Sequence, residues 1–160
     1  QSNSGEPVNH FRYDDTFASA GMPDAAYIKT LAADGVDAVV NIAPPGAHGS
    51  LDDEAGLVEA ASMTYVNIAV DWNTPSQDDV DEFLAFMQSH QNDSVFLHCQ
   101  MNMRATAFAM LHRVINQRID PAQAEKDMHR VWKPNRTWAQ LINNALGRHN
   151  IEFQVAVPDE

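Results

Sequence analysis

The sequence predicts an α/β fold in which a mostly parallel central sheet is flanked by helices on both faces. Short apolar runs typical of buried strands alternate with segments whose apolar residues recur at helical spacing. Strands that alternate with helices are usually parallel, and a parallel sheet needs helices on both faces to bury it. Because the alternation continues along the chain, we expect a single domain over residues 1–160, with residues 1–9 as a loose polar lead-in.

Each predicted strand is a short run of β-branched, aromatic or small apolar residues between turn-forming residues. Consecutive prolines end the second run, and the fourth leads directly into the single cysteine. The last run alternates apolar and polar residues, as an edge strand does. In chain order, the predicted strands are residues 11–20, 36–43, 64–70, 94–97 and 151–157.

Each predicted helix combines a start or stop signal with an apolar stripe. Gly35 is a natural stop for the first helix, and Ser50 with the following aspartates caps the second. Ser76 with Asp79 starts the third, and Pro121 lies at the start of the fifth. The six predicted helices cover residues 23–32, 50–62, a segment from 76, a segment from about 105, a segment from 120, and a last segment ending near 147.

The composition favours a globular protein whose partner is not a large polyanion. The chain has 160 residues, of which 44% are hydrophobic and 20% charged, so it can bury a real core. A net charge of -12 argues against nucleic acid or an anionic membrane surface as a partner. No apolar run approaches the ~20 residues of a membrane span. The sequence does not predict an oligomeric state.

Cysteine and histidine usage predicts neither a metal nor a cofactor. A single cysteine excludes internal disulfides and cysteine-cluster metal sites, and the seven histidines form no close-spaced ligand pair. The sequence begins at Gln1 rather than Met, from which we expect an exported or periplasmic protein, with a cytoplasmic one as the alternative.

The clearest functional signal is the segment Val95–Thr106. It contains an apolar strand, the single cysteine Cys99, a tight turn carrying Arg104, and the start of a helix near Ala105. At such a strand end, backbone N–H groups at the helix start face the sulfur and any bound oxyanion, which favours a thiolate nucleophile. The Arg104 guanidinium adds donors that match phosphate or sulfate. The alternative for Cys99 is a small buried hydrophobic residue.

Motifs along most of the chain resemble bacterial protein-tyrosine-phosphatase-like proteins. This group is related to dual-specificity phosphatases and to the domain fused to β-lactamase-like hydrolases. The resemblance implies a single-domain protein-tyrosine-phosphatase-like fold and a phosphorylated small molecule or phosphoprotein as the substrate. It is carried by residues 19–23, 36–42, 71–81, the loop after His98, and residues 131–138.

The resemblance also implies roles for individual residues. Cys99 would attack phosphorus, Arg104 and the loop amides would hold the phosphoryl oxygens, and Asp71 would protonate the leaving oxygen. Burial against Trp72 would help Asp71 to retain its proton, whereas the alternative for Asp71 is a loop or helix-cap carboxylate. His98 would orient the loop through a hydrogen bond; the alternative for His98 is a hydrogen-bonded histidine at the strand end with no such role. The implied anion-binding loop further includes Gln100, Met101, Asn102, Met103, Ala105 and Thr106.

The loop is one residue shorter than in tyrosine phosphatases, because four residues separate Cys99 from Arg104. In an ungapped alignment, Asn102 falls where those enzymes carry Gly, and Asn tolerates the left-handed conformation that Gly supplies. Rhodanese loops resemble Cys-x-x-Gly-x-Arg, which has the same spacing. Three functions therefore stay open: a phosphatase with a cysteinyl-phosphate intermediate, a non-catalytic oxyanion-binding or regulatory domain, and a rhodanese-like sulfurtransferase.

Overall fold

The computed structural model describes residues 6–159, which fall into two compact units. Within the described residues, unit 1 comprises 6–69 and 92–105, and unit 2 comprises 70–91 and 106–159. All five strands belong to unit 1 and most of the helical residues to unit 2.

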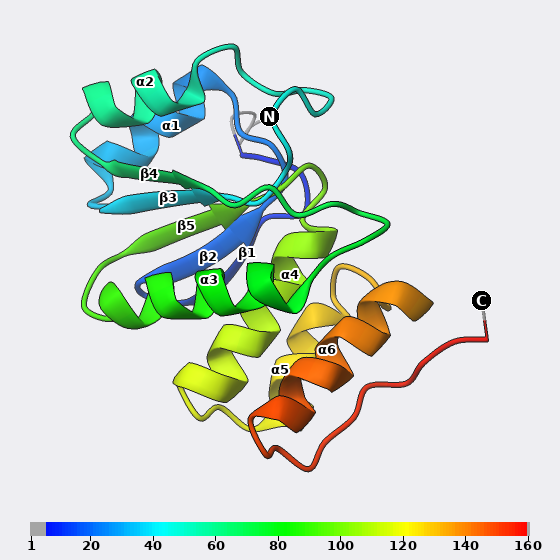
Figure 1. Cartoon of the computed structure of the whole chain (residues 1–160). Helices are drawn as coiled ribbons and strands as arrows, with labels where there is room; N and C mark the ends of the chain where they lie inside the picture. The colour runs from blue at the N-terminus through cyan, green and yellow to red at the C-terminus, as the bar shows by residue number, and fades with distance from the viewer. Residues whose placement is uncertain (1–5, 160) are drawn as a thin grey trace. The chain divides into compact units, whose positions relative to one another are not determined.

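Unit 1 is built on a five-stranded sheet with the order β1-β2-β5-β3-β4 (Figure 1). The strands β1 and β2 are antiparallel, whereas the pairs β2–β5, β5–β3 and β3–β4 are parallel, which confirms the mostly parallel sheet. The register brings the last residues of four strands, Ala20, His98, Asn41 and Asn67, into one row at the carboxyl edge. The strand bounds are β1 Phe11–Asp14, β2 Phe17–Ala20, β3 Ala38–Asn41, β4 Thr64–Asn67 and β5 Val95–His98.

Two helices of unit 1, α1 (Ala25–Ala33) and α2 (Glu54–Ala60), lie side by side on one face of the sheet (Figure 1). Asp24 caps α1 by accepting a hydrogen bond from the Tyr27 N–H at 2.8 Å. The core between these helices and the sheet consists of Ala20, Ile28, Leu31, Val39, Val58, Met63 and Phe96. This packing fixes the central strand β5, which leads into Cys99.

Unit 2 is helical. Ser76 and Asp79 form the predicted capping box at the start of α3. The helix α4 begins at Met103, earlier than the expected start near Ala105, and its first three residues belong to unit 1. The helices are α3 Gln77–Ser89, α4 Met103–Leu111, the π-helix η1 His112–Asn116, α5 Pro121–Met128 and α6 Arg136–Arg148.

Two strand predictions differ from the structure. Residues 11–20 form two strands, because the Asp14 carboxylate accepts the Thr16 N–H at 2.8 Å and closes a turn between them. Residues 151–157 form no strand. The backbone N–H and C=O of Val155 instead bond to the side-chain amide of Asn143, at 2.8 and 3.0 Å. A single side chain of α6 thus takes the hydrogen bonds that a neighbouring strand would supply.

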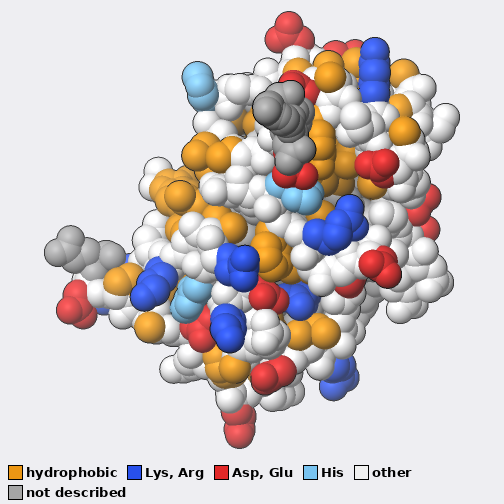
Figure 2. All heavy atoms as spheres, turned by 180° about the vertical axis from the view of Figure 1, so that it is seen from behind, with side chains coloured by type: hydrophobic (Ala, Val, Ile, Leu, Met, Phe, Trp, Pro, Cys, Tyr) orange, Lys and Arg blue, Asp and Glu red, His pale blue; other side chains and the backbone are white. Residues whose placement is uncertain are grey.

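The surface carries both signs of charge despite the net charge of -12. On the face shown in Figure 2, Lys and Arg side chains lie among acidic and hydrophobic ones. In the part of the chain that the structure describes, no helix combines the length and apolarity that a membrane span requires.

Candidate active site

Cys99 lies at the carboxyl end of the central strand β5, and residues 99–102 connect it to α4; we call these residues the Cys loop. The Cys99 side chain is buried, with 1% exposure, and its N–H donates to the Ala20 carbonyl at 3.3 Å. Arg104 lies in the first turn of α4 and is also buried. The fold therefore places Cys99 and Arg104 at the two ends of one short turn that leads into a helix N-terminus.

Three consecutive carbonyls of the Cys loop are held by groups outside it. The Cys99 carbonyl bonds to His98 Nδ1 at 3.1 Å, and the Gln100 carbonyl accepts the Met22 N–H at 3.0 Å. The Met101 carbonyl accepts a hydrogen bond from Asn9 Nδ2 at 3.0 Å.

These contacts set the direction of the loop amides. In a trans peptide the C=O and the following N–H point in opposite directions, so the N–H groups of Gln100 and Met101 point away from the framework. Among the hydrogen bonds of residues 6–159, neither N–H is a donor. Successive N–H groups turned to one side of a loop form a concave binding site for an oxyanion.

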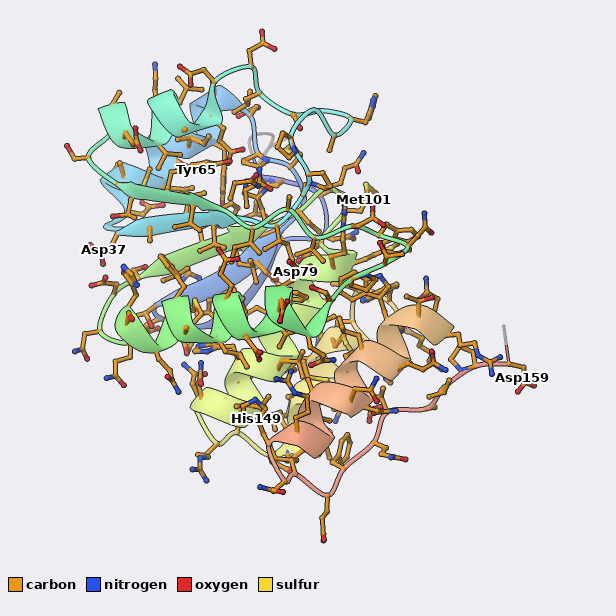
Figure 3. The ribbon with its side chains drawn as sticks, viewed as in Figure 1. Asp37, Tyr65, Asp79, Met101, His149 and Asp159 are labelled. Atoms are coloured by element: carbon orange, nitrogen blue, oxygen red, sulfur yellow. The ribbon has the colours of Figure 1, made fainter. Side chains whose placement is uncertain are left out.

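The remaining predicted loop residues differ in exposure. Asn102 is buried and has the left-handed conformation that we expected it to tolerate, with φ 70°. The Met101 side chain is 47% exposed (Figure 3). Gln100 and Met103 are half-buried, and Ala105 is buried. Thr106 belongs to unit 2, where its hydroxyl accepts a hydrogen bond from Trp132 Nε1 at 3.0 Å.

A buried polar network at the carboxyl edge of the sheet supports the Cys loop through His98. His98 Nε2 lies 2.5 Å from Glu54 Oε2, and both side chains are buried. Asn41 Nδ2 donates to Glu54 Oε1 and to the Tyr65 hydroxyl, each at 3.2 Å. A backbone carbonyl can only accept, so His98 Nδ1 carries a proton where it meets Cys99. His98 Nε2 faces the Glu54 carboxylate, and the two contacts of the ring together fix the orientation of the imidazole.

Burial also perturbs the pKa of Tyr65, the tyrosine of this network. Its side chain extends from β4 (Figure 3). Burial raises the pKa of Tyr65 above its ordinary value, because a buried phenolate is poorly solvated. The Asn41 hydrogen bond lowers this pKa, and the nearby charge of Glu54 raises it.

Glu54 was not predicted as a site residue, because in the sequence it resembles one more acidic residue at a helix start. The available signal was indirect. Asn41 ends β3 in register with His98, so polar side chains from two adjacent strands meet at the sheet edge.

The prediction that Asp71 is buried against Trp72 is wrong, because Asp71 is exposed. Its Oδ2 accepts hydrogen bonds from the N–H of Asn73 and from both the N–H and the hydroxyl of Thr74, at 2.9–3.0 Å. The polar segment after Asp71 thus closes a turn on the carboxylate. Trp72 packs instead against Trp132 and Trp138, with ring centroids 5.4 and 6.0 Å away.

Among residues 6–159, no group of three or more His, Cys, Asp or Glu side chains is arranged to hold a metal ion. The polar groups of the site are the thiol, the guanidinium and the loop amides, which are suited to bind a tetrahedral anion directly.

Comparisons with known proteins agree with this geometry. A family model described as a DSP-PTPase phosphatase of polymorphic toxin systems matches residues 18–115. The crystal structure of a DUF442 protein, a candidate phosphatase from Shewanella putrefaciens CN-32, is 30% identical, with a TM-score of 0.79 over 91% of this chain and 94% of that one. A sequence comparison with curated proteins finds no match.

Two more distant structures support the fold. Tk-PTP in its active form is 16% identical, with a TM-score of 0.72 over 87% of this chain and 97% of that one. P. aeruginosa TpbA is 19% identical, with a TM-score of 0.69 over 89% of each chain.

Proposed function

Because the chain belongs to the DSP-PTPase phosphatase family of polymorphic toxin systems, and is a phosphoric monoester hydrolase of the protein-tyrosine-phosphatase type, we propose that it works through a covalent phosphoryl intermediate on Cys99. One observation carries this proposal. Cys99 lies at the end of the central strand, in a turn whose carbonyls bond to groups outside the turn. The element that follows this turn is a helix with Arg104 in its first turn.

The proposed reaction has two steps. In the first, the Cys99 thiolate attacks phosphorus, the S–P bond forms, and the P–O bond to the leaving group breaks as that oxygen takes a proton. In the second, water attacks phosphorus, the S–P bond breaks, and the thiolate and inorganic phosphate are released. Arg104 and the loop amides stabilise the negative charge on the three non-bridging oxygens in both steps.

We assign Asp71 as the proton donor in the first step and the proton acceptor in the second. The hydrogen bonds that the Asp71 carboxyl group accepts determine which of its two oxygens would carry the transferred proton. Oδ2 accepts from Asn73 and Thr74, so the transferred proton would be carried by Oδ1. The turn thereby fixes the orientation of the carboxyl group, which is what a general acid requires.

The proposed substrate is a phosphomonoester of a small molecule or a phosphoprotein. The net charge of -12 repels polyanions at long range. A shorter loop with four residues between Cys99 and Arg104 encloses a smaller cup, which suits a single terminal phosphoryl group. We assign the Met101 side chain, which is exposed, to the wall of the cup beside the leaving group.

Sulfur transfer by a rhodanese-like mechanism has the same loop spacing in its favour, but the family match and the phosphatase-like neighbour favour phosphoryl chemistry. The same comparisons favour an enzyme over a non-catalytic oxyanion-binding domain.

Turnover of an aryl phosphate and an alkyl phosphate by the parent and three variants tests the proposal. Cys99→Ser should abolish turnover of both substrates, because a serine hydroxyl is a much weaker nucleophile than a thiolate. Asp71→Asn should change the aryl phosphate rate little, since that leaving group needs little protonation. The alkyl phosphate rate should fall within the ~10²–10⁴ range of general acid catalysis.

Asp78→Asn is the matched control, because Asp78 is an exposed aspartate in the first turn of α3 and undergoes the same chemical change. It should leave both rates unchanged. Turnover that persists in Cys99→Ser would contradict the nucleophile assignment. Equal effects of Asp71→Asn on the two substrates would contradict the general acid assignment.

A further inference from the structure

The segment just before β1 is bonded directly to the Cys loop. Asn9 Nδ2 donates to the Met101 carbonyl at 3.0 Å, and Asn102 Nδ2 donates to the Asn9 carbonyl at 2.7 Å. The Asn9 amide thus holds the residue before Asn102, and the Asn102 amide holds the backbone of Asn9 itself. The bonded residues are 92 and 93 positions apart in the sequence. We call this pair of hydrogen bonds the amide clamp.

Both asparagines of the clamp have left-handed backbones, with φ 57° at Asn9 and 70° at Asn102. Glycine adopts this conformation more easily than asparagine does. Asn102 stands where the resembling phosphatases carry Gly, so the backbone alone does not require a side chain there. What asparagine adds at this position is the amide group that reaches the Asn9 carbonyl.

A third segment closes the contact. The Val8 carbonyl accepts the Gly21 N–H at 2.9 Å, and the neighbouring Met22 N–H bonds to the Gln100 carbonyl at 3.0 Å. A Cβ on Gly21 would lie 2.4 Å from Val8 Cγ1 and 2.7 Å from the Gln100 carbonyl oxygen, which is closer than real contacts allow. The exit of β2 therefore lies directly between the N-terminal segment and the Cys loop.

The clamp is not explained by stability alone. Asn102 is fully buried, and among the described residues its Oδ1 has no hydrogen-bond partner. A buried acceptor without a donor is destabilising, so glycine would remove an unfavourable group while preserving the backbone conformation. The unpartnered oxygen is a local cost, and the favourable contact that the Asn102 side chain makes is its bond to the Asn9 carbonyl.

We propose that Asn9 and Asn102 are positioning residues that make the N-terminal segment part of the phosphoryl-binding framework. The bond from Asn9 fixes the Met101 carbonyl, and thereby the carboxyl end of the Cys loop, directly after the Gln100 and Met101 N–H groups that point away from the framework. Without the clamp, the loop is held there by the contacts of Gly21 and Met22 alone, and its amides are less well preorganised for an oxyanion. The inference rests on the proposed function, since it concerns the same loop.

The test uses Asn9→Gly, Asn102→Gly and the double variant, all of which accept a left-handed backbone. Asn150→Gly is the matched control, because Asn150 has φ 60°, is exposed and lies in unit 2. Protection of Cys99 from iodoacetamide by inorganic phosphate gives a phosphate affinity that does not depend on turnover. The thermal unfolding midpoint and the kcat and KM for an aryl phosphate are measured alongside.

Each single clamp variant should bind phosphate about 3–10-fold more weakly, the range expected for loss of one hydrogen bond. The double variant should be little weaker than either single variant, because the two bonds hold one contact. In the clamp variants, the KM should rise by a larger factor than kcat falls. The thermal unfolding midpoint of Asn102→Gly should not decrease. The control Asn150→Gly should match the parent in every measurement.

The outcomes separate this inference from the proposed function. Parent-like phosphate affinity in both single variants overturns the clamp, whatever the turnover. Weaker affinity with a parent that binds phosphate but hydrolyses no phosphoester supports the clamp and overturns the phosphatase mechanism. A parent whose Cys99 is not protected by phosphate overturns both.

Discussion

The substitution Glu54→Ala removes the acceptor on which the buried side of the Cys loop depends. Both oxygens of this carboxylate are used, one by His98 Nε2 at 2.5 Å and the other by Asn41 Nδ2 at 3.2 Å. Alanine leaves both nitrogens in a buried site without this acceptor. The link through Glu54 between His98 and Asn41, at the carboxyl edge of the sheet, is therefore lost.

Two kinds of interaction energy give the expected change in the free energy of unfolding. Removing one partner of a buried ion pair typically destabilises a protein by about 3–5 kcal/mol. A buried His98 nitrogen without its acceptor costs about 1–3 kcal/mol. The Asn41 amide keeps the Tyr65 hydroxyl as a partner and loses one hydrogen bond, worth about 0.5–1.5 kcal/mol, so this second reckoning gives about 1.5–4.5 kcal/mol. We expect Glu54→Ala to lower the free energy of unfolding by about 3–5 kcal/mol.

Glu54→Gln should be less damaging. The glutamine oxygen can accept from Asn41, and its amide can donate to Nε2 of a neutral His98, so both contacts have a replacement. We expect Glu54→Gln to lower the free energy of unfolding by about 1.5–3 kcal/mol, the contribution of a hydrogen bond to a charged group. Urea unfolding of the parent and the two variants measures these differences.

Glu59→Ala is the control, because Glu59 is exposed on the same helix α2 and should change stability by less than about 0.5 kcal/mol. If Glu54→Ala is no more destabilising than this control, the buried pair does not support the site and the reasoning fails.

Two further predictions concern the anion and the pH dependence. Arg104→Lys should weaken phosphate binding by about 1.5–3 kcal/mol, because lysine keeps the charge but loses the fork of donors; unchanged affinity by calorimetry would contradict the assigned contact. Because burial raises the pKa of Tyr65, the unfolded chain loses its phenol proton first as pH increases. This stabilising contribution is complete below pH ~10 and is lost as pH rises through the folded pKa, so Tyr65→Phe should show a shallower loss of unfolding free energy in alkali than the parent. Parallel curves would show that Tyr65 does not contribute.

The sequence predicts best those features whose signals lie within a few residues of each other. The capping box of Ser76 and Asp79 was recognisable because its two members are three positions apart. The left-handed Asn102 was expected because few residues other than Gly and Asn adopt that conformation readily. The strand, the cysteine and the helix start likewise form one continuous segment.

Features that depend on distant parts of the chain were missed. Glu54 lies 44 positions from His98, and Asn9 lies 92 positions from Met101, so neither contact has a local pattern. The predicted burial of Asp71 was wrong for the opposite reason. The burial was inferred from the neighbouring Trp72, whereas the next residues, Asn73 and Thr74, form a polar turn that keeps the carboxylate exposed.

The most direct test of the central claim is to trap the intermediate. The parent protein is mixed with an aryl phosphate, quenched in acid within a turnover, digested and examined by mass spectrometry. The account predicts one added phosphoryl group on the peptide that contains Cys99, and none in Cys99→Ser. Turnover without any phosphoryl adduct on that peptide, or with the adduct on another residue, would contradict it.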